Sequence, residues 1–137
     1  MTQEEKELQL IDLSARLPYG VKGIITYDES NTAFTVEGID NNVLHLSNAE
    51  ECYVEDFKPY LRPMSSMTEE EFYEYNYIRF SKIKDRINYE RVDVGKFHNV
   101  GIIPIKEYID WLNAHHFDYR GLIEKGLALE APEGMYD

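Results

Sequence analysis

The chain is best understood outward from residues 104–123, Pro-Ile-Lys-Glu-Tyr-Ile-Asp-Trp-Leu-Asn-Ala-His-His-Phe-Asp-Tyr-Arg-Gly-Leu-Ile, which contain its only tryptophan. Apolar side chains recur there at the i, i+3, i+4 and i+7 spacing of one helix face: Ile105, Tyr108, Ile109 and Leu112. Pro104 suits the first helical position, because its missing N–H would have no partner there in any case. We expect a helix over about residues 104–115 and a second short helical turn over about 119–125, which ends near Gly126.

The composition predicts a globular protein that needs neither a metal, a cofactor nor a disulfide. Hydrophobic residues make up 43% of the 137 residues, which is close to globular usage. The single cysteine, Cys52, can form neither an internal disulfide nor a zinc framework. The N-terminus lacks a basic start followed by an apolar run, and no apolar stretch reaches the roughly 18 residues of a membrane span. We therefore expect a cytoplasmic protein with no membrane association.

Charge is the strongest deviation from average composition. The net charge is −12, from 26 acidic and 14 basic residues. Residues 1–60 carry 12 acidic and 4 basic residues, whereas residues 61–137 carry 14 and 10. A negative field repels nucleic acid, so nucleic-acid binding is not expected. The acidic half either keeps the protein soluble or imitates nucleic acid to occupy a basic partner. Because no regular carboxylate spacing matches that of phosphates, we favour solubility.

The N-terminal half predicts a helix followed by a sheet. Residues 2–17 begin with a Thr2–Glu5 capping box and end before Pro18, as expected of a helix. Two apolar stripes suggest that this helix is buried against the sheet: Leu8, Ile11 and Ala15, beside Leu10, Leu13 and Leu17. Short runs rich in β-branched and aromatic residues, separated by turn residues, predict antiparallel strands at 21–27, 33–39, 43–46 and 52–54. These strands would form a meander or a small barrel-like sheet.

Residues 55–67 are interpreted as a connector, because Pro59 and Pro63 interrupt a regular ladder. Thr68 and Glu71 then form a second capping box, which favours a helix over residues 72–80. Alternating tyrosines in that stretch leave a strand as the alternative. The predicted fold is α+β, with an N-terminal helix, an antiparallel sheet and C-terminal helices packed on it. We expect a single domain over residues 1–137, with a sheet portion at about 19–62 and a helical portion at about 67–126.

His115, His116 and Asp118 are the candidates for a metal-dependent hydrolase or nuclease. Adjacent helical residues point about 100° apart, so the two imidazoles cannot easily share one metal. The chain also lacks the His-Glu-x-x-His motif. Cys52 with His45 or His98 is a further arrangement, of thiol and base, although a lone cysteine in an apolar strand is more often a buried filler. We therefore assign no catalytic residue, cofactor or metal ligand.

Protein binding is predicted at the corner that follows the central helix. Phe117, Tyr119 and Arg120 are of types enriched at interfaces. Arg120 offers a bidentate fork for a carboxylate, and tyrosine, of which the chain has 11, combines apolar area with a polar tip. In the alternative interpretation, Phe117 and Tyr119 pack inward and Arg120 pairs internally. Its carboxylate partner would then be Asp118 or Asp110.

Three stretches resemble a family of short uncharacterised proteins in phage-like and mobile elements of gut bacteria. They are residues 11–22 (Ile-Asp-Leu-Ser-Ala-Arg-Leu-Pro-Tyr-Gly-Val-Lys), 58–70 (Lys-Pro-Tyr-Leu-Arg-Pro-Met-Ser-Ser-Met-Thr-Glu-Glu) and 110–123 (Asp-Trp-Leu-Asn-Ala-His-His-Phe-Asp-Tyr-Arg-Gly-Leu-Ile). The resemblance implies a viral or mobile-element setting and transfers no activity, cofactor or catalytic residue. We expect a non-enzymatic accessory protein that binds a host or viral protein. The alternatives are the metal-dependent hydrolase or nuclease and the acidic nucleic-acid mimic.

Overall fold

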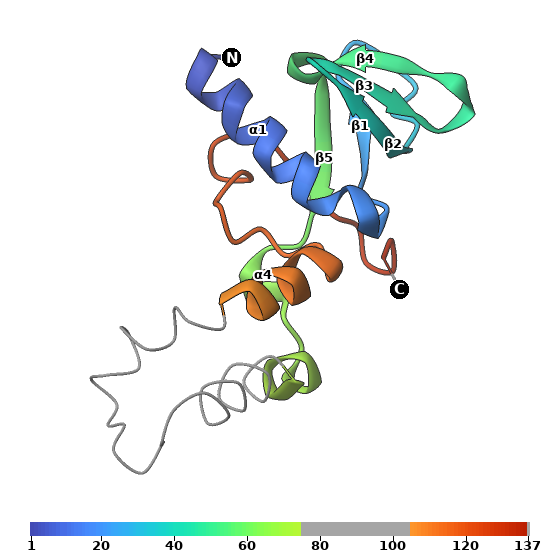
Figure 1. Ribbon diagram of the computed structural model, residues 1–137. Coiled ribbons are helices and arrows are strands. Elements are labelled where there is room, and N and C mark those ends of the chain that lie inside the picture. Colours follow the sequence, from blue (N-terminus) through green and yellow to red (C-terminus); the bar gives the residue numbers. More distant parts are fainter. Residues whose placement is uncertain (75–104, 137) are drawn as a thin grey trace. The chain divides into compact units, whose positions relative to one another are not determined.

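The computed structural model describes residues 1–74 and 105–136 (Figure 1). It contains an N-terminal helix, a six-stranded mixed sheet and a C-terminal helix, which confirms the predicted α+β class. The chain divides into two compact units, Met1–Met64 with Asn113–Asp137, and Ser65–Leu112. The first unit contains the sheet and is described first. No helix in the described ranges is long and apolar enough to cross a membrane.

Helix α1, Gln3–Arg16, begins with the predicted capping box. The Glu5 amide donates to Thr2 Oγ1 at 3.1 Å, and the Thr2 amide donates to Glu5 Oε1 at 2.9 Å. The expected burial of this helix is wrong in one respect, because Ile11 is 57% exposed. The buried face instead carries three polar residues beside one leucine: Gln9, Asp12, Leu13 and Arg16. A polar stripe of this kind folds inward only when its groups find partners.

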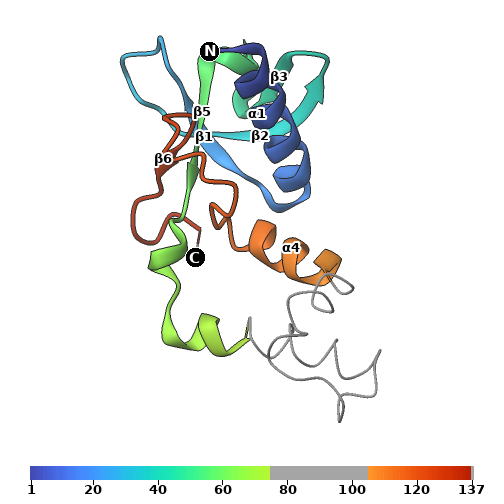
Figure 2. The same ribbon diagram turned by 90° about the vertical axis from the view of Figure 1, so that its left-hand side faces the viewer.

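The sheet contains the predicted meander and two further strands (Figures 1 and 2). The strands are β1 (Lys22–Ile25), β2 (Phe34–Asp40), β3 (Val43–Leu46), β4 (Glu51–Tyr53), β5 (Phe57–Leu61) and β6 (Leu129–Glu130). Their order is β4-β3-β2-β1-β5-β6. All pairs are antiparallel except β5 with β6, which is parallel. The described sheet therefore has two edge strands, β4 and β6.

The interpretation of residues 55–67 as a connector is wrong over residues 57–61, which form β5. Pro59 lies opposite Gly23, and the neighbouring hydrogen bond joins the Thr26 amide to the Asp56 carbonyl at 2.8 Å. The alternation of an antiparallel ladder then makes the Pro59 position a non-hydrogen-bonded one, so the absent N–H costs no bond with β1. Gly23 permits this close approach, because a Cβ there would lie 2.4 Å from the Lys58 carbonyl oxygen.

The hydrophobic core lies between α1 and the sheet, and it is closed by the C-terminal segment. Phe57 and Leu61 of β5 alternate with half-buried residues and face this core, as a half-buried strand should. The buried residues of the core are Leu13, Val21, Ile25, Phe34, Val36, Leu44, Leu46, Cys52, Val54, Phe57, Leu61, Leu122, Leu127 and Ala128. Residues from the N-terminal 61 positions and from beyond position 121 thus share one core.

The second unit contains residues 69–74, which are helical, and most of α4, Ile105–Ala114. The predicted capping box is present, with the Glu71 amide donating to Thr68 Oγ1 at 3.1 Å and the Thr68 amide to Glu71 Oε1 at 3.0 Å. Helix α4 confirms the helix predicted over about 104–115. The choice between helix and strand beyond residue 74, up to residue 80, lies outside the described residues, as does His98.

Candidate functional site

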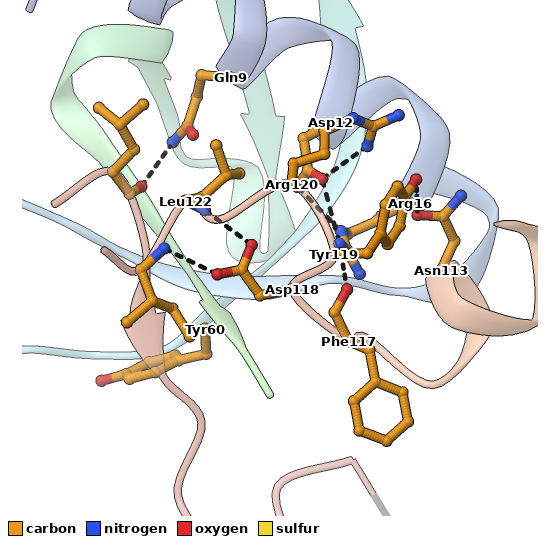
Figure 3. A network of polar contacts seen from close by, with 12 residues as sticks. Gln9, Asp12, Arg16, Tyr60, Asn113, Phe117, Asp118, Tyr119, Arg120 and Leu122 are labelled. Carbon is orange, nitrogen blue, oxygen red and sulfur yellow. Dashed lines mark hydrogen bonds and ion pairs between the residues drawn. The ribbon is translucent and has the colours of Figure 1, made fainter. Parts of the chain in front are cut away.

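The corner predicted to bind a partner is attached to α1 by a buried ion-pair network (Figure 3). Arg16 donates to both Asp12 oxygens, from Nε at 2.9 Å and from Nη2 at 3.1 Å. The same Nη2 reaches the Phe117 carbonyl at 2.6 Å, and Arg120 Nη1 donates to Asp12 Oδ1 at 2.8 Å. Asp12 and Arg16 are fully buried. We call Asp12, Arg16 and Arg120 the polar clamp.

The three residues predicted to bind a partner are part of this corner. Phe117 is fully buried, and the Arg62 guanidinium lies 4.2 Å from the centre of its ring. Tyr119 is half-buried, with the guanidinium carbons of Arg16 and Arg120 at 5.4 and 4.7 Å from its ring centre. Its hydroxyl donates to Asn113 Oδ1 at 2.9 Å. The geometry agrees with the alternative in which these side chains hold the corner together.

The expected internal partner of Arg120 is corrected by the structure. Asp12 of α1 takes this role, whereas Asp118 accepts from two backbone amides, of Leu122 at 2.8 Å and of Ile123 at 2.9 Å. The two amide bonds hold the Asp118 carboxylate on its own turn, and Arg120 pairs with the buried Asp12 instead. The amides belong to the turn over residues 122–126, which corresponds to the predicted second helical turn and ends at Gly126 with a φ of 74°.

His115, His116 and Asp118 do not form a metal site. His116 lies two residues beyond the end of α4 with a φ of 62°, and its ring stacks on Tyr136 at 3.7 Å between centres. Burial, reinforced by the charge of Arg16, lowers the pKa of His116 to about 4. His115 stacks against Phe117 at 6.4 Å, on a different neighbour. Among residues 1–74 and 105–136, no group of three or more His, Cys, Asp or Glu residues could hold a metal ion.

Two further polar groups join the C-terminal segment to the sheet. Gln9 Nε2 lies 3.1 Å from both the Phe57 and the Leu127 carbonyl oxygens, so it bridges β5 and the segment before β6. The Tyr136 hydroxyl accepts from the Lys22 amide at 2.9 Å and donates to the Tyr60 carbonyl at 2.6 Å. It thereby continues the β1–β5 pairing beyond Gly23. Burial raises the pKa of Tyr136 to about 12.

A different surface feature lies between the β1–β2 connection and the edge strand β4. It is a hollow of about 260 Å³ lined by Tyr27, Val43, Glu51, Cys52 and Tyr53, which we call the tyrosine hollow. Tyr27 is 66% exposed and Tyr53 is 58% exposed. Exposed tyrosines around a depression are typical of binding surfaces.

The main chain beside the hollow has an open edge. The Val54 amide donates to the Asn42 carbonyl at 2.9 Å, and the Leu46 amide to the Glu50 carbonyl at 2.8 Å. Because hydrogen-bonded pairs alternate in an antiparallel ladder, the Glu51 and Tyr53 amides point away from β3. As β4 is an edge strand of the described sheet, these amides point away from that sheet.

Cys52 contributes to the hollow but is poorly suited to act as a nucleophile. Burial, with a smaller contribution from the charge of Asp56, raises the pKa of its thiol to about 11. Leu44 pairs with Cys52 and His45 pairs with Glu51, so the imidazole and the thiol lie on opposite faces of the sheet. The arrangement of Cys52 with His45 as a thiol and base is therefore wrong, and His98 lies outside the described residues.

The stretch of sequence that contains the lining residues of the hollow carries no lysine or arginine. Residues 26–56 contain eight acidic residues and no lysine or arginine, and we call this stretch the acid-only segment. Glu55 at its end pairs with Lys6 of α1 at 3.2 Å. Neither this segment nor the hollow was expected from the sequence, although a count of charges over shorter windows would have found the segment.

Neither a protein-family model, a curated protein nor a solved structure matches this chain.

Proposed function

We propose that this chain is a non-enzymatic accessory protein of a phage or mobile element that acts in the cytoplasm by binding another protein. The observation that carries the proposal is the tyrosine hollow. Tyr27 and Tyr53 expose most of their side chains beside β4, an edge strand of the described sheet, in the part of the chain that carries the acid-only segment. The phage setting rests on the resemblance of residues 11–22, 58–70 and 110–123 to phage-like proteins.

Protein binding is favoured over hydrolysis because the candidate catalytic residues make structural contacts. Asp118 caps a turn, His116 stacks in the interior and His115 lies against Phe117. In the described ranges these three groups do not converge on one point where a substrate atom could react. Tyrosine at the hollow costs little conformational entropy to immobilise, which suits association.

Affinity capture with matched variants tests the proposal. Full-length wild-type protein, a Tyr27→Ser/Tyr53→Ser variant and a Tyr73→Ser variant are immobilised, exposed to a bacterial host lysate and analysed by mass spectrometry. Tyr73 is a matched control, because it is 65% exposed but lies in the other unit. We expect wild type and Tyr73→Ser to capture the same protein and the double variant to lose it. Capture that is equal for all three variants would contradict the assignment of the binding surface.

A further inference from the structure

We propose that the tyrosine hollow receives an arginine side chain of the bound partner. The inference rests on the proposed protein-binding function and specifies the chemistry of the partner. It would make the partner a protein with an exposed arginine in a basic region, which docks on the acid-only segment.

The lining of the hollow matches a guanidinium group. Val43, which pairs with Tyr53, provides apolar surface for the aliphatic stem, and Tyr27 and Tyr53 provide exposed aromatic rings. Glu51 adds a carboxylate at the same place. A planar guanidinium can stack on a tyrosine ring and pair with a carboxylate at once, whereas an ammonium cannot do so equally well. The volume of about 260 Å³ lies below that of drug-sized ligand sites, so it suits one side chain.

The fold already combines an arginine, a tyrosine ring and a carboxylate at another place. Within the polar clamp, Arg120 lies 4.7 Å from the Tyr119 ring centre and 2.8 Å from an Asp12 oxygen. The tyrosine hollow is likewise lined by tyrosines and a glutamate, but there the arginine has to come from a partner. Among the described residues, the ion pair of Glu51 is with His45 at 3.8 Å, and it carries opposite charges only when the imidazole is protonated.

Charge complementarity selects a cationic partner. The eight acidic residues of the acid-only segment have no lysine or arginine among them in sequence, and the chain as a whole carries −12. Such a surface attracts basic proteins and accelerates their encounter, with an effect that weakens as salt rises. A neutral or acidic partner would gain nothing from this field.

Titration of the full-length, ¹⁵N-labelled protein by NMR tests the inference. The probes are three capped pentapeptides with a central arginine, lysine or citrulline between pairs of glycines, and citrulline keeps the arginine shape without its charge. We expect the arginine peptide to shift the amide signals of Tyr27, Glu51 and Tyr53 with a dissociation constant on the order of 1 mM. The lysine peptide should bind about threefold more weakly and the citrulline peptide about tenfold more weakly.

Matched variants distinguish binding in the hollow from a general attraction to the negative charge of the protein. Glu51→Gln should weaken the arginine peptide about threefold, whereas Glu37→Gln removes the same charge from an exposed position outside the hollow and should have little effect. Tyr53→Ser should also weaken binding about threefold. Equal shifts by the arginine and citrulline peptides, or no shift around the hollow, would overturn the arginine assignment.

The two experiments fail independently. If the tyrosine double variant loses a captured protein but the arginine peptide leaves the hollow unshifted, protein binding stands and the arginine assignment is wrong. If the arginine peptide binds as expected but capture does not depend on the tyrosines, the hollow binds arginine but is not the surface that captures the partner, so the assignment of the binding surface is wrong.

Discussion

The polar clamp and the acid-only segment use charged residues in opposite ways. In the clamp, Asp12 and Arg16 are fully buried and each finds a partner within the fold. In the acid-only segment, Glu51 and most of the other carboxylates are exposed, and no lysine or arginine of the segment neutralises them. Buried charges need internal partners because desolvation is costly, whereas exposed charges remain available to an external partner. The difference therefore separates residues that hold the fold from residues that can bind.

The strongest test of this contrast is removal of the buried carboxylate. Asp12→Ala leaves Arg16 buried without its counter-ion and Arg120 without its internal partner. We expect a loss of about 3–5 kcal/mol in the free energy of unfolding, measured by urea denaturation. The matched control is Asp40→Ala, an exposed aspartate in the acid-only segment, which should change stability by less than about 0.5 kcal/mol. Similar losses for both variants would remove the distinction between the two regions.

The second test uses pH, because His116 is buried in its neutral form beside the clamp. Its pKa falls from 6.5 to about 4 in the folded protein. Between these two values the unfolded chain binds a proton at this imidazole and the folded chain does not. The neutral imidazole thus contributes full stability above pH 6.5, and this contribution is lost as the pH falls toward 4. Between about pH 7 and pH 5 we expect wild type to lose about 2 kcal/mol through this group.

His116→Asn isolates that effect, because asparagine tolerates the left-handed backbone at this position and does not titrate. The variant should be less stable near neutral pH but should show a flatter pH dependence, measured by urea denaturation at several pH values. His45→Asn is the control, since its imidazole is 45% exposed and lies in the acid-only segment. A slope that is unchanged in His116→Asn and flattened in His45→Asn would contradict the assignment.

Most of the fold could be predicted, because its local patterns agree with its final structure. The capping boxes at Thr2 and Thr68 and the turn residues between β1 and β4 are local features that need no distant partner. Strand β5 was missed because Pro59 breaks a ladder in general, and only its pairing register with Gly23 shows that no bond with β1 is lost. That register depends on a strand more than 30 residues earlier in the chain.

The functional features were harder to predict for a similar reason. The apolar stripes of α1 do not include Gln9, Asp12 and Arg16, although the spacing of three and four places these polar residues on one helix face. Asp12 and Arg16 pair with each other within α1, and Gln9 also bonds the Phe57 carbonyl. Their other partners, Leu127, Phe117 and Arg120, lie more than 100 residues away in sequence. The tyrosine hollow likewise joins a β1–β2 connection to an edge strand. A hydrophobic pattern carries no information about such long-range polar contacts.

The smallest expected effect concerns Arg120, which the sequence placed in a partner-binding surface and the structure places in the clamp. Arg120→Ala removes one donor from Asp12 but leaves the bidentate pair with Arg16. Because Arg120 is itself 21% exposed, we expect a loss of only about 1 kcal/mol by urea denaturation. Partner capture by the folded protein should be unchanged, whereas Tyr27→Ser/Tyr53→Ser should keep wild-type stability and lose capture. If Arg120→Ala instead keeps full stability and loses the captured protein, the corner at Phe117, Tyr119 and Arg120 is the binding surface. The clamp would then bind the partner, and the acid-only segment would not.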